Sequence, residues 1–210
     1  MEEETKRIHS RIQAVFRTWY EGIEDMETPP EEGRVNKWFL EDPEFDQEIR
    51  DAHVGDYDEI VADEGESWAK VPGGKMAVIL VTDQFSRNMF RKTSKVFASD
   101  FIALKLAKEM LANGEYDELE FCKKIFCYVP LEHSEDVEDQ AQCVKAVNDI
   151  LENPGNEQQK RYAEYVLPYI EKHQEIIETF GRFPHRNEYL GRESTEEEIE
   201  FLKTCNRYGQ

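Results

Sequence analysis

The chain has 210 residues, of which 46 are acidic and 26 basic, and its formal net charge is −20 at pH 7. Such a surplus of acid repels a phosphate backbone and excludes non-specific binding to nucleic acid. Apolar residues make up 39% of the chain, with 12 Phe, 9 Tyr and 3 Trp, which is enough for a hydrophobic core and excludes wholesale disorder.

The apolar runs and the cysteines predict a cytoplasmic protein without a membrane partner. The longest apolar run, residues 76–81, is far shorter than the roughly 20 residues of a membrane span. The acidic start of the chain is unlike a leader peptide. The four cysteines include no CxxC pair, so we expect reduced structural thiols rather than disulfides or a redox or metal role.

The first predicted helix covers residues 2–22, where apolar side chains recur every three or four positions. Residues 23–33 are acidic and contain Pro29 and Pro30, which is typical of a linker, with a boundary near Gly33. We therefore expect an N-terminal helix and acidic linker over residues 1–33 and an all-helical domain over residues 34–210.

The next elements are also predicted as helices. Asp42 followed by Pro43 predicts a helix start, and apolar positions continue to Ile60. A loop over residues 65–74 precedes a long segment, residues 76–91, which is interpreted as a helix because no turn residue interrupts it.

The second half of the chain repeats this pattern. Ser99 is a predicted N-cap, Pro130 is expected to end the helix that begins near residue 119, and Ser134 is expected to start the next one. Further helices are predicted at residues 157–180 and after a capping box at residues 194–197. No segment alternates like a strand, so we predict an all-α single domain of stacked antiparallel helix pairs, although no 34-residue repeat is present.

The first of three polar motifs covers residues 83–91. Asp83, Arg87 and Arg91 are spaced to share one helical face, which a solvated acid–base ladder would also explain. Both flanks are apolar, and residues 75–108 carry seven Lys or Arg but two Asp. This basic island in an acidic protein is typical of an anion pocket, because arginine presents a fixed fork to carboxylate or phosphate.

The second motif covers residues 130–136. His133 and Asp136 lie three residues apart at the start of a predicted helix, so both can face one cavity. A histidine beside a carboxylate is suited to general acid–base chemistry. The simpler alternative is that Ser134 caps the helix while Glu135 and Asp136 complement its dipole, which leaves His133 unexplained.

The third motif, residues 180–187, places Arg182, His185, Arg186 and Asn187 in one loop after a helix end. Such polar density in a loop is typical of binding sites. If His185 met His133 and either Asp83 or Asp136, the set would suit a metal ion, but the sequence does not establish that they meet. Surface or half-buried positions are expected for the other histidines, His9, His53 and His173.

The motifs, in their order and spacing, resemble one known family over about residues 35–202. The matching segments are Trp38-Phe39, Phe45-Asp46-x-x-Ile49, Trp68, residues 80–88, Phe97-Ala98-Ser99-Asp100, His133-Ser134-Glu135-Asp136, residues 181–187 and Leu190-Gly191-Arg192. This pattern resembles the bacterial family of unknown function DUF924. The resemblance implies an all-helical fold similar to tetratricopeptide repeats and a shared site formed by the polar motifs, but no reaction.

The chain departs from the family pattern in three places. Ser86 stands where the family usually has proline, and Glu132 stands where it usually has an apolar residue, often methionine. The segment 1–33 has no counterpart that the resemblance places. Of these, Glu132 adds a carboxylate beside His133 and can alter the ligand.

Two functions remain open from sequence. The first is a small-molecule site, binding an anion and able to support acid–base catalysis, where the three motifs converge. Its predicted catalytic residues are His133, Asp136 and His185. Its predicted ligand-binding residues are Asp83, Gln84, Arg87, Asn88, Arg91, Glu132, Glu135, Arg182, Arg186, Asn187 and Arg192. No cofactor or metal ligand is assigned.

The second function is a non-enzymatic scaffold whose stacked helix pairs bind a peptide or protein partner. In that case the polar motifs would be internal salt bridges and helix caps. Arg87 and Arg182 would then pair with Asp83, Glu135 or Asp136 rather than face a ligand.

Overall fold

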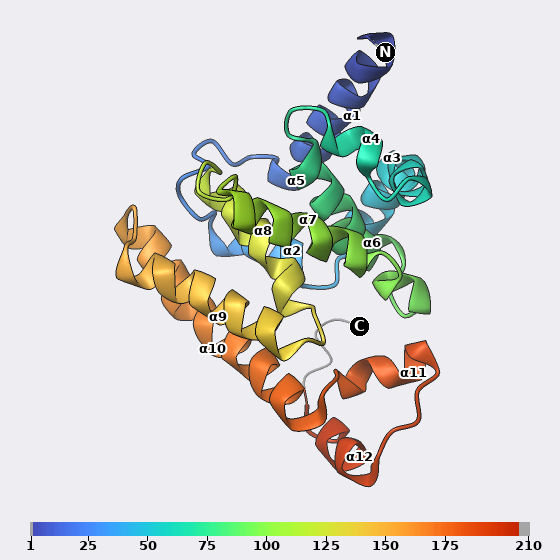
Figure 1. The fold of residues 1–210 in the computed structure, drawn as a ribbon, viewed down its shortest axis with the longest axis vertical. Coiled ribbons are helices and arrows are strands. Elements are labelled where there is room, and N and C mark those ends of the chain that lie inside the picture. The colour runs from blue at the N-terminus through green and yellow to red at the C-terminus, as the bar shows by residue number, and fades with distance from the viewer. Residues whose placement is uncertain (1, 206–210) are drawn as a thin grey trace.

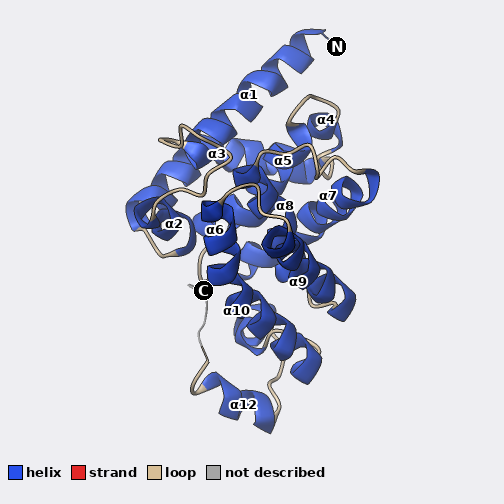
Figure 2. Cartoon of the chain, turned by 90° about the vertical axis from the view of Figure 1, so that its left-hand side faces the viewer, coloured by secondary structure: helices blue, strands red, loops and turns tan. Residues whose placement is uncertain are grey.

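The computed structural model describes residues 2–205, apart from the side chain of Glu32, and residues 206–210 of the predicted domain lie outside it. Within these residues the chain is all-helical, as predicted, and contains no strand (Figure 2). The longer helices are α1 (Glu2–Tyr20), α2 (Glu32–Phe39), α3 (Pro43–Ala62), α7 (Asp100–Asn113), α8 (Phe121–Glu132), α9 (Val137–Glu152) and α10 (Glu157–Phe180). The shorter elements are α4 (Glu66–Ala69), α5 (Gly74–Ile79), η1 (Leu80–Phe85), α6 (Ser86–Met89), η2 (Ser94–Phe97), η3 (Pro184–Arg186), α11 (Asn187–Leu190) and α12 (Glu196–Leu202).

Helix α1 lies on the predicted segment, and its apolar stripe is buried in the same core as the rest of the chain. Trp19 is fully buried, and its ring lies 5.9 Å from that of Trp38 and 5.2 Å from that of Phe126. The linker after α1 therefore connects two segments that share one hydrophobic core. In Figure 1 the start of α1 extends away from this core.

Residues 74–89 form one nearly continuous helical segment, as expected of a helix rather than a strand. Its start requires glycine, because a Cβ on Gly74 would lie 1.7 Å from the carbonyl oxygen of Trp68. Its middle, η1, is π-helical, which the sequence did not reveal. The buried hydroxyl of Ser86 donates to the carbonyl oxygen of Thr82 at 2.8 Å, and so does that of Ser99. A π-helical turn of this kind often marks a functional position.

Two predicted helix boundaries in residues 130–137 are wrong. Helix α8 continues past Pro130 to Glu132, because the ring removes one N–H donor while the next turn still forms through the bond from His133 N to Val129 O, 3.1 Å. Helix α9 is capped by Asp136, whose carboxylate accepts from two backbone N–H groups, and not by Ser134.

Helices α9 and α10 lie side by side as an antiparallel pair joined by a short turn (Figure 1). Helix α10 ends at Phe180, with Gly181 at a φ of 68°, as predicted. The capping box of α12 is formed by Thr195 and Glu198, one residue later than expected. The likeness to tetratricopeptide repeats stays a prediction.

Three cysteines, Cys122, Cys127 and Cys143, are buried and form no disulfide. Burial raises the pKa of Cys122 and Cys127 to about 12, so both remain protonated thiols. This is the chemistry we expect of structural thiols.

Candidate functional site

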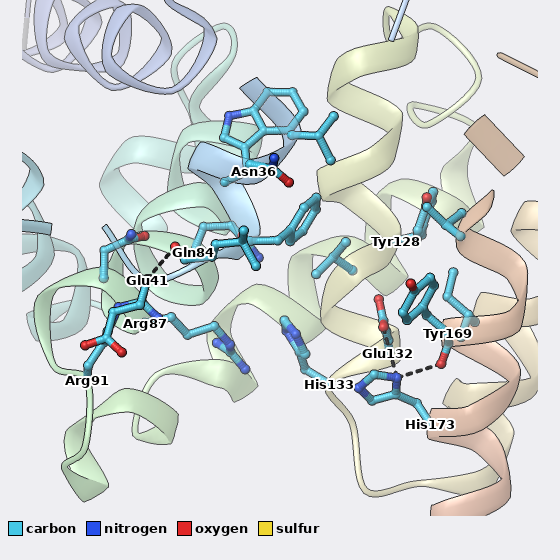
Figure 3. A pocket seen from close by; sticks show the side chains of 18 of the residues that line it. Asn36, Glu41, Gln84, Arg87, Arg91, Tyr128, Glu132, His133, Tyr169 and His173 are labelled. Atoms are coloured by element: carbon cyan, nitrogen blue, oxygen red, sulfur yellow. Dashed lines mark hydrogen bonds and ion pairs between the residues drawn. The ribbon is translucent and has the colours of Figure 1, made fainter. Parts of the chain in front are cut away.

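A cavity of about 440 Å³ lies between α2, α6, the end of α8, α10 and the short helix η3 (Figure 3). This volume is within the usual range of small-molecule sites, about 300–1,000 Å³. All three polar motifs reach it. The predicted site residues in its wall are Gln84, Arg87, Asn88, Arg91, Glu132, His133, His185 and Arg186. Its aromatic lining is Trp38, Phe39, Phe97, Tyr128, Tyr162, Tyr165 and Tyr169.

His133 is paired with Asp83, not with Asp136 as expected. Its Nδ1 lies 2.8 Å from Oδ1 of Asp83, which is fully buried on η1. A carboxylate oxygen can only accept, so Nδ1 of His133 donates to Asp83, and this bond fixes the orientation of the ring. The other ring nitrogen, Nε2, lies on the opposite edge of the imidazole, and His133 lines the cavity. Within residues 2–205, Nε2 makes no hydrogen bond.

Asp83 stays ionised although it is fully buried. Burial alone would raise its pKa, but the nearby Arg87 guanidinium, 3.2 Å from Oδ1, and His133 outweigh this effect and hold the pKa below its usual range. Gln84 also donates to Oδ2 at 2.5 Å. The π-helical turn thus places an ionised carboxylate, that of Asp83, behind His133.

Arg87 is neutralised by two carboxylates. It donates to both oxygens of Asp100, at 2.9 and 3.0 Å, and to the backbone oxygen of Asp83 at 2.6 Å. Burial opposes its charge, but Asp100 and Asp83 outweigh burial and raise the pKa of Arg87. Asp100 opens α7 and was not among the predicted site residues, because nothing in its local spacing ties it to Arg87.

Arg186 is a buried cation with little compensation. Its side chain is 7% exposed, and its Nε donates to no acceptor in residues 2–205. The nearest carboxylate is Asp100, at 3.9 Å, which Arg87 already holds. Burial lowers the pKa of Arg186 to about 10, since Asp100 offsets burial only in part. Its guanidinium lies over the rings of Phe97 and Phe183, at 4.7 and 4.4 Å.

The adjacent His185 is held in its neutral form. Burial, and after it the positive charge of Arg186, lowers its pKa to about 3. At neutral pH this imidazole therefore presents one N–H donor and one nitrogen acceptor, with no charge of its own.

Arg91 and Asn88 share one carboxylate at the other end of the cavity. Arg91 donates to Asp46 at 2.6 and 3.2 Å, and Asn88 donates to it at 2.7 Å. Asp46, on α3, was part of the family pattern but was not a predicted site residue. The charge of Arg91 is consequently matched within the protein.

Besides Asp83, which lies behind His133, five predicted site residues do not line the cavity. Asp136 is exposed and caps α9. The other four form what we call the glutamate network, which is made by Glu135, Arg182, Asn187 and Arg192 together with Glu198. Glu135 pairs with Arg192 at 2.7 and 3.0 Å, and Glu198 pairs with Arg182 at 2.6 and 2.8 Å.

Two histidines are more buried than the sequence suggested. His53 is 2% exposed and pairs with Asp56 at 2.7 Å, so the expected half-exposed position is wrong. His173 is also buried, at 7% exposed, and lines the cavity beside Glu132. The prediction for His9, on the exposed side of α1, is confirmed.

The combination of His133, His185 and an aspartate considered for a metal ion is not assembled. No three His, Cys, Asp or Glu side chains cluster in a way that would hold a metal ion in the part of the chain that the structure describes. Among the same residues, no helix has both the length and the apolar character required to span a membrane.

Comparison with known proteins agrees with the resemblance found in the motifs. The family model described as "Bacterial protein of unknown function (DUF924)" matches residues 15–206, and so begins inside α1. A solved structure, the protein of unknown function ATU0120 from Agrobacterium tumefaciens, is similar with a TM-score of 0.74 and 28% sequence identity. The similarity covers 94% of this chain and 99% of that one. No curated protein matches the chain. The family match spans most of the sequence, and the chain therefore belongs to the DUF924 family of bacterial proteins of unknown function.

Proposed function

We propose that this protein binds a small anionic molecule in the cavity, with Arg186 as the anion receptor and His133 as a proton-transfer group. The observation that carries the proposal is the charge balance of Arg186. It is 93% buried, and Asp100, its one carboxylate neighbour within 4.0 Å in residues 2–205, is already engaged by both nitrogens of Arg87. A buried guanidinium in this state gains strongly from an anionic ligand.

The surroundings of Arg186 orient it for such a ligand. Phe97 and Phe183 lie against the guanidinium plane and restrict its movement. Neutral His185 beside it can add one uncharged hydrogen bond to an anion without competing for it. A planar fork of donors matches a carboxylate or a phosphate.

His133 supplies the acid–base chemistry in this proposal. Asp83 fixes its tautomer and would stabilise the imidazolium formed when Nε2 takes a proton. Because Asp83 is buried and its pKa lies below the usual range, it would stay ionised throughout. A proton would move between Nε2 and the bound molecule or a water beside it.

We assign the glutamate network and Asp136 a supporting role, not a role in contacting the ligand. Glu135 accepts from the backbone N–H of Phe183 at 2.8 Å, and Arg192 donates to the carbonyl oxygen of Phe183 at 3.1 Å. These bonds hold the residue that packs against Arg186. They therefore position the anion receptor from outside the cavity.

Calorimetry with acetate and inorganic phosphate as probes tests the anion site. We expect both to bind the wild-type protein and to lose binding in Arg186→Met, which keeps the side-chain volume between the two rings. Arg17→Met is the matched control, since Arg17 is exposed on α1 and its loss changes the net charge equally. Equal binding by both variants, or no binding by the wild type, would show that Arg186 is not an anion receptor.

The role of His133 is tested by counting protons. An anion in contact with an imidazole favours its protonated form, so ligand binding and proton exchange at His133 are linked. Calorimetry in buffers of different ionisation enthalpy measures the number of protons exchanged on binding. We expect this number to be smaller in His133→Asn than in the wild type; an equal number in both would place the exchanged proton elsewhere.

The alternative is a helical scaffold for a peptide or protein, and one observation favours it. Four apolar or aromatic side chains at the cavity mouth are 42–59% exposed: Phe39, Leu40, Tyr165 and Tyr169. Native mass spectrometry of the purified protein distinguishes the two functions. A retained small molecule supports the cavity site, and a retained polypeptide with an empty cavity supports the scaffold.

A further inference from the structure

The cavity contains a second charge that the protein does not neutralise. Glu132 ends α8, and its carboxylate lies in the cavity wall with a side-chain exposure of 16%. Its single ion-pair contact within the described residues is with Nδ1 of His173, at 3.2 Å. Burial lowers the pKa of His173, so this partner is neutral near pH 7 and does not offset the charge of Glu132.

The contact with His173 is also shared. Its Nδ1 lies 2.8 Å from the carbonyl oxygen of Tyr169, and both neighbours are acceptors. The single N–H at Nδ1 forms its hydrogen bond with this backbone oxygen and leaves Glu132 only the 3.2 Å contact. Glu132 is therefore a largely buried carboxylate whose one charged-group contact among residues 2–205 is a neutral ring, so it would gain from a cation.

Four tyrosines line the same cavity as this carboxylate. Tyr128 precedes Glu132 by one helical turn on α8, and α10 presents Tyr162, Tyr165 and Tyr169 on the stripe that leads to His173. The rings of Tyr165 and Tyr169 are 5.5 Å apart. A carboxylate among aromatic rings is the environment that binds ammonium groups, through charge attraction and cation–π contact.

Arg87 lies on the wall opposite Glu132 (Figure 3). Figure 3 shows Glu132, Tyr128, Tyr169 and His173 together on one side, Arg87 on the other, and His133 between them. Among these cavity charges, the two with the poorest compensation are therefore of opposite sign, namely Arg186 and Glu132. A purely anionic ligand would satisfy the first and leave the second as it is.

We propose that the ligand is a zwitterion, whose carboxylate or phosphate binds at Arg186 and whose ammonium group binds Glu132 among the tyrosines. This inference rests on the proposed function and names its substrate class. It makes Glu132 the residue that selects for the cationic end of the molecule. Arg186 and Glu132 line the same cavity as His133, where proton transfer can take place.

Binding measurements with two matched series of probes test the inference. One series is linear ω-aminoalkanoates of increasing length, and the other is the unsubstituted alkanoates of the same lengths. At the length that spans the cavity, we expect the wild-type protein to bind the aminoalkanoate at least about tenfold more tightly than the alkanoate. Butylammonium, which carries the cation alone, should bind more weakly than either.

Substitution of Glu132 then assigns the preference. Glu132→Gln keeps the shape and a hydrogen-bonding group for His173, and we expect it to bind the two series equally. Glu171→Gln, on the exposed face of α10, makes the same change in charge and should keep the wild-type preference. A preference that survives in Glu132→Gln would overturn the role of this carboxylate.

The two proposals fail in different ways. If the wild type binds alkanoates as tightly as aminoalkanoates at every length, the zwitterion inference is wrong while the anion site stands. If it binds neither series, the anion site itself is wrong. Thermal melting of each variant confirms that binding is compared between folded proteins.

Discussion

The cavity and the glutamate network each contain an arginine from the same short loop, residues 181–187, but the two arginines differ in how well carboxylates neutralise their charge. In the network, Arg182 donates to both carboxylate oxygens of Glu198, at 2.6 and 2.8 Å, and this hydrogen bonding raises the pKa of Arg182. Four residues later, Arg186 shares Asp100 with Arg87, and burial lowers its pKa to about 10. The number of arginines in a motif therefore does not locate an anion site. An anion site is indicated by a guanidinium that has no carboxylate of its own nearby.

The largest effect on stability is expected at Arg87, whose ion pairs hold the wall of the cavity together. Arg87→Met leaves Asp83 and Asp100 without their main cation, and Asp83 is fully buried. Breaking a buried pair from one side costs about 3–5 kcal/mol of unfolding free energy. Urea denaturation followed by tryptophan fluorescence measures this loss. A loss below about 1 kcal/mol would mean that Arg87 is not held by these carboxylates.

The next effect is in the glutamate network, at Glu198. This carboxylate is 2% exposed and accepts from Arg182, from Asn187 and from the backbone N–H of Thr195. Glu198→Gln should lower the free energy of unfolding by about 2 kcal/mol, because it replaces the charge-assisted bonds from Arg182 with weaker bonds to a neutral amide. Binding of acetate to the folded variant should stay within about twofold of the wild type. A loss of binding larger than this would place the network in the ligand site.

Much of the fold is predictable because an amphipathic helix requires apolar residues every three or four positions, and this spacing is visible in the sequence. The starts of α3 and α10, the end of α10 and the absence of strands within residues 2–205 follow from apolar spacing and local capping residues. The position of the π-helical turn η1 does not follow from them. One of its carbonyl oxygens, that of Thr82, accepts from the hydroxyl of Ser99, which is 17 residues away in the sequence. The end of α8 was misplaced because proline weakens a last turn without forbidding it.

The sequence predicted most of the residues that line the candidate site, but not which of them pair with one another. The sequence singled out His133 and Asp83, yet it paired His133 with the nearby Asp136 because spacing reveals only neighbours. The actual partner lies 50 residues away, as the fold brings η1 against the end of α8. Asp100 and His173 were missed for the same reason, since each looks like an ordinary helix residue until its distant partner is known.

Arg186 should respond to substitution in the opposite direction from Arg87. Because burial opposes its charge and its nearest carboxylate is 3.9 Å away, Arg186→Met should raise the free energy of unfolding, by about 1–2 kcal/mol. Methionine can fill the space between Phe97 and Phe183. The same urea denaturation measures the gain. A loss of stability would show that the contact with Asp100 is a structural ion pair and that the contrast with Arg87 is wrong.

The smallest expected effect is a pH dependence that comes from His185. In the unfolded chain this histidine takes up a proton near its ordinary pKa, whereas burial lowers its pKa in the folded protein to about 3. Between these values the unfolded state binds more protons, so stability falls as the pH falls. From about pH 7 to pH 5.5, above the range in which most carboxylates titrate, His185 should account for a loss of about 1 kcal/mol.

The free energy of unfolding of His185→Gln, measured at both pH values, isolates this contribution because the variant lacks the titrating group. Over the same interval the variant should lose about 1 kcal/mol less stability than the wild type. The exposed His9 provides the control, and His9→Gln should keep the wild-type dependence. His173 is buried as well, and its lowered pKa adds to the loss in the same direction in both proteins, so it cancels from the difference. Identical pH dependence in His185→Gln and the wild type would mean that burial does not lower the pKa of His185, and that this residue becomes a second cation beside Arg186 as the pH falls.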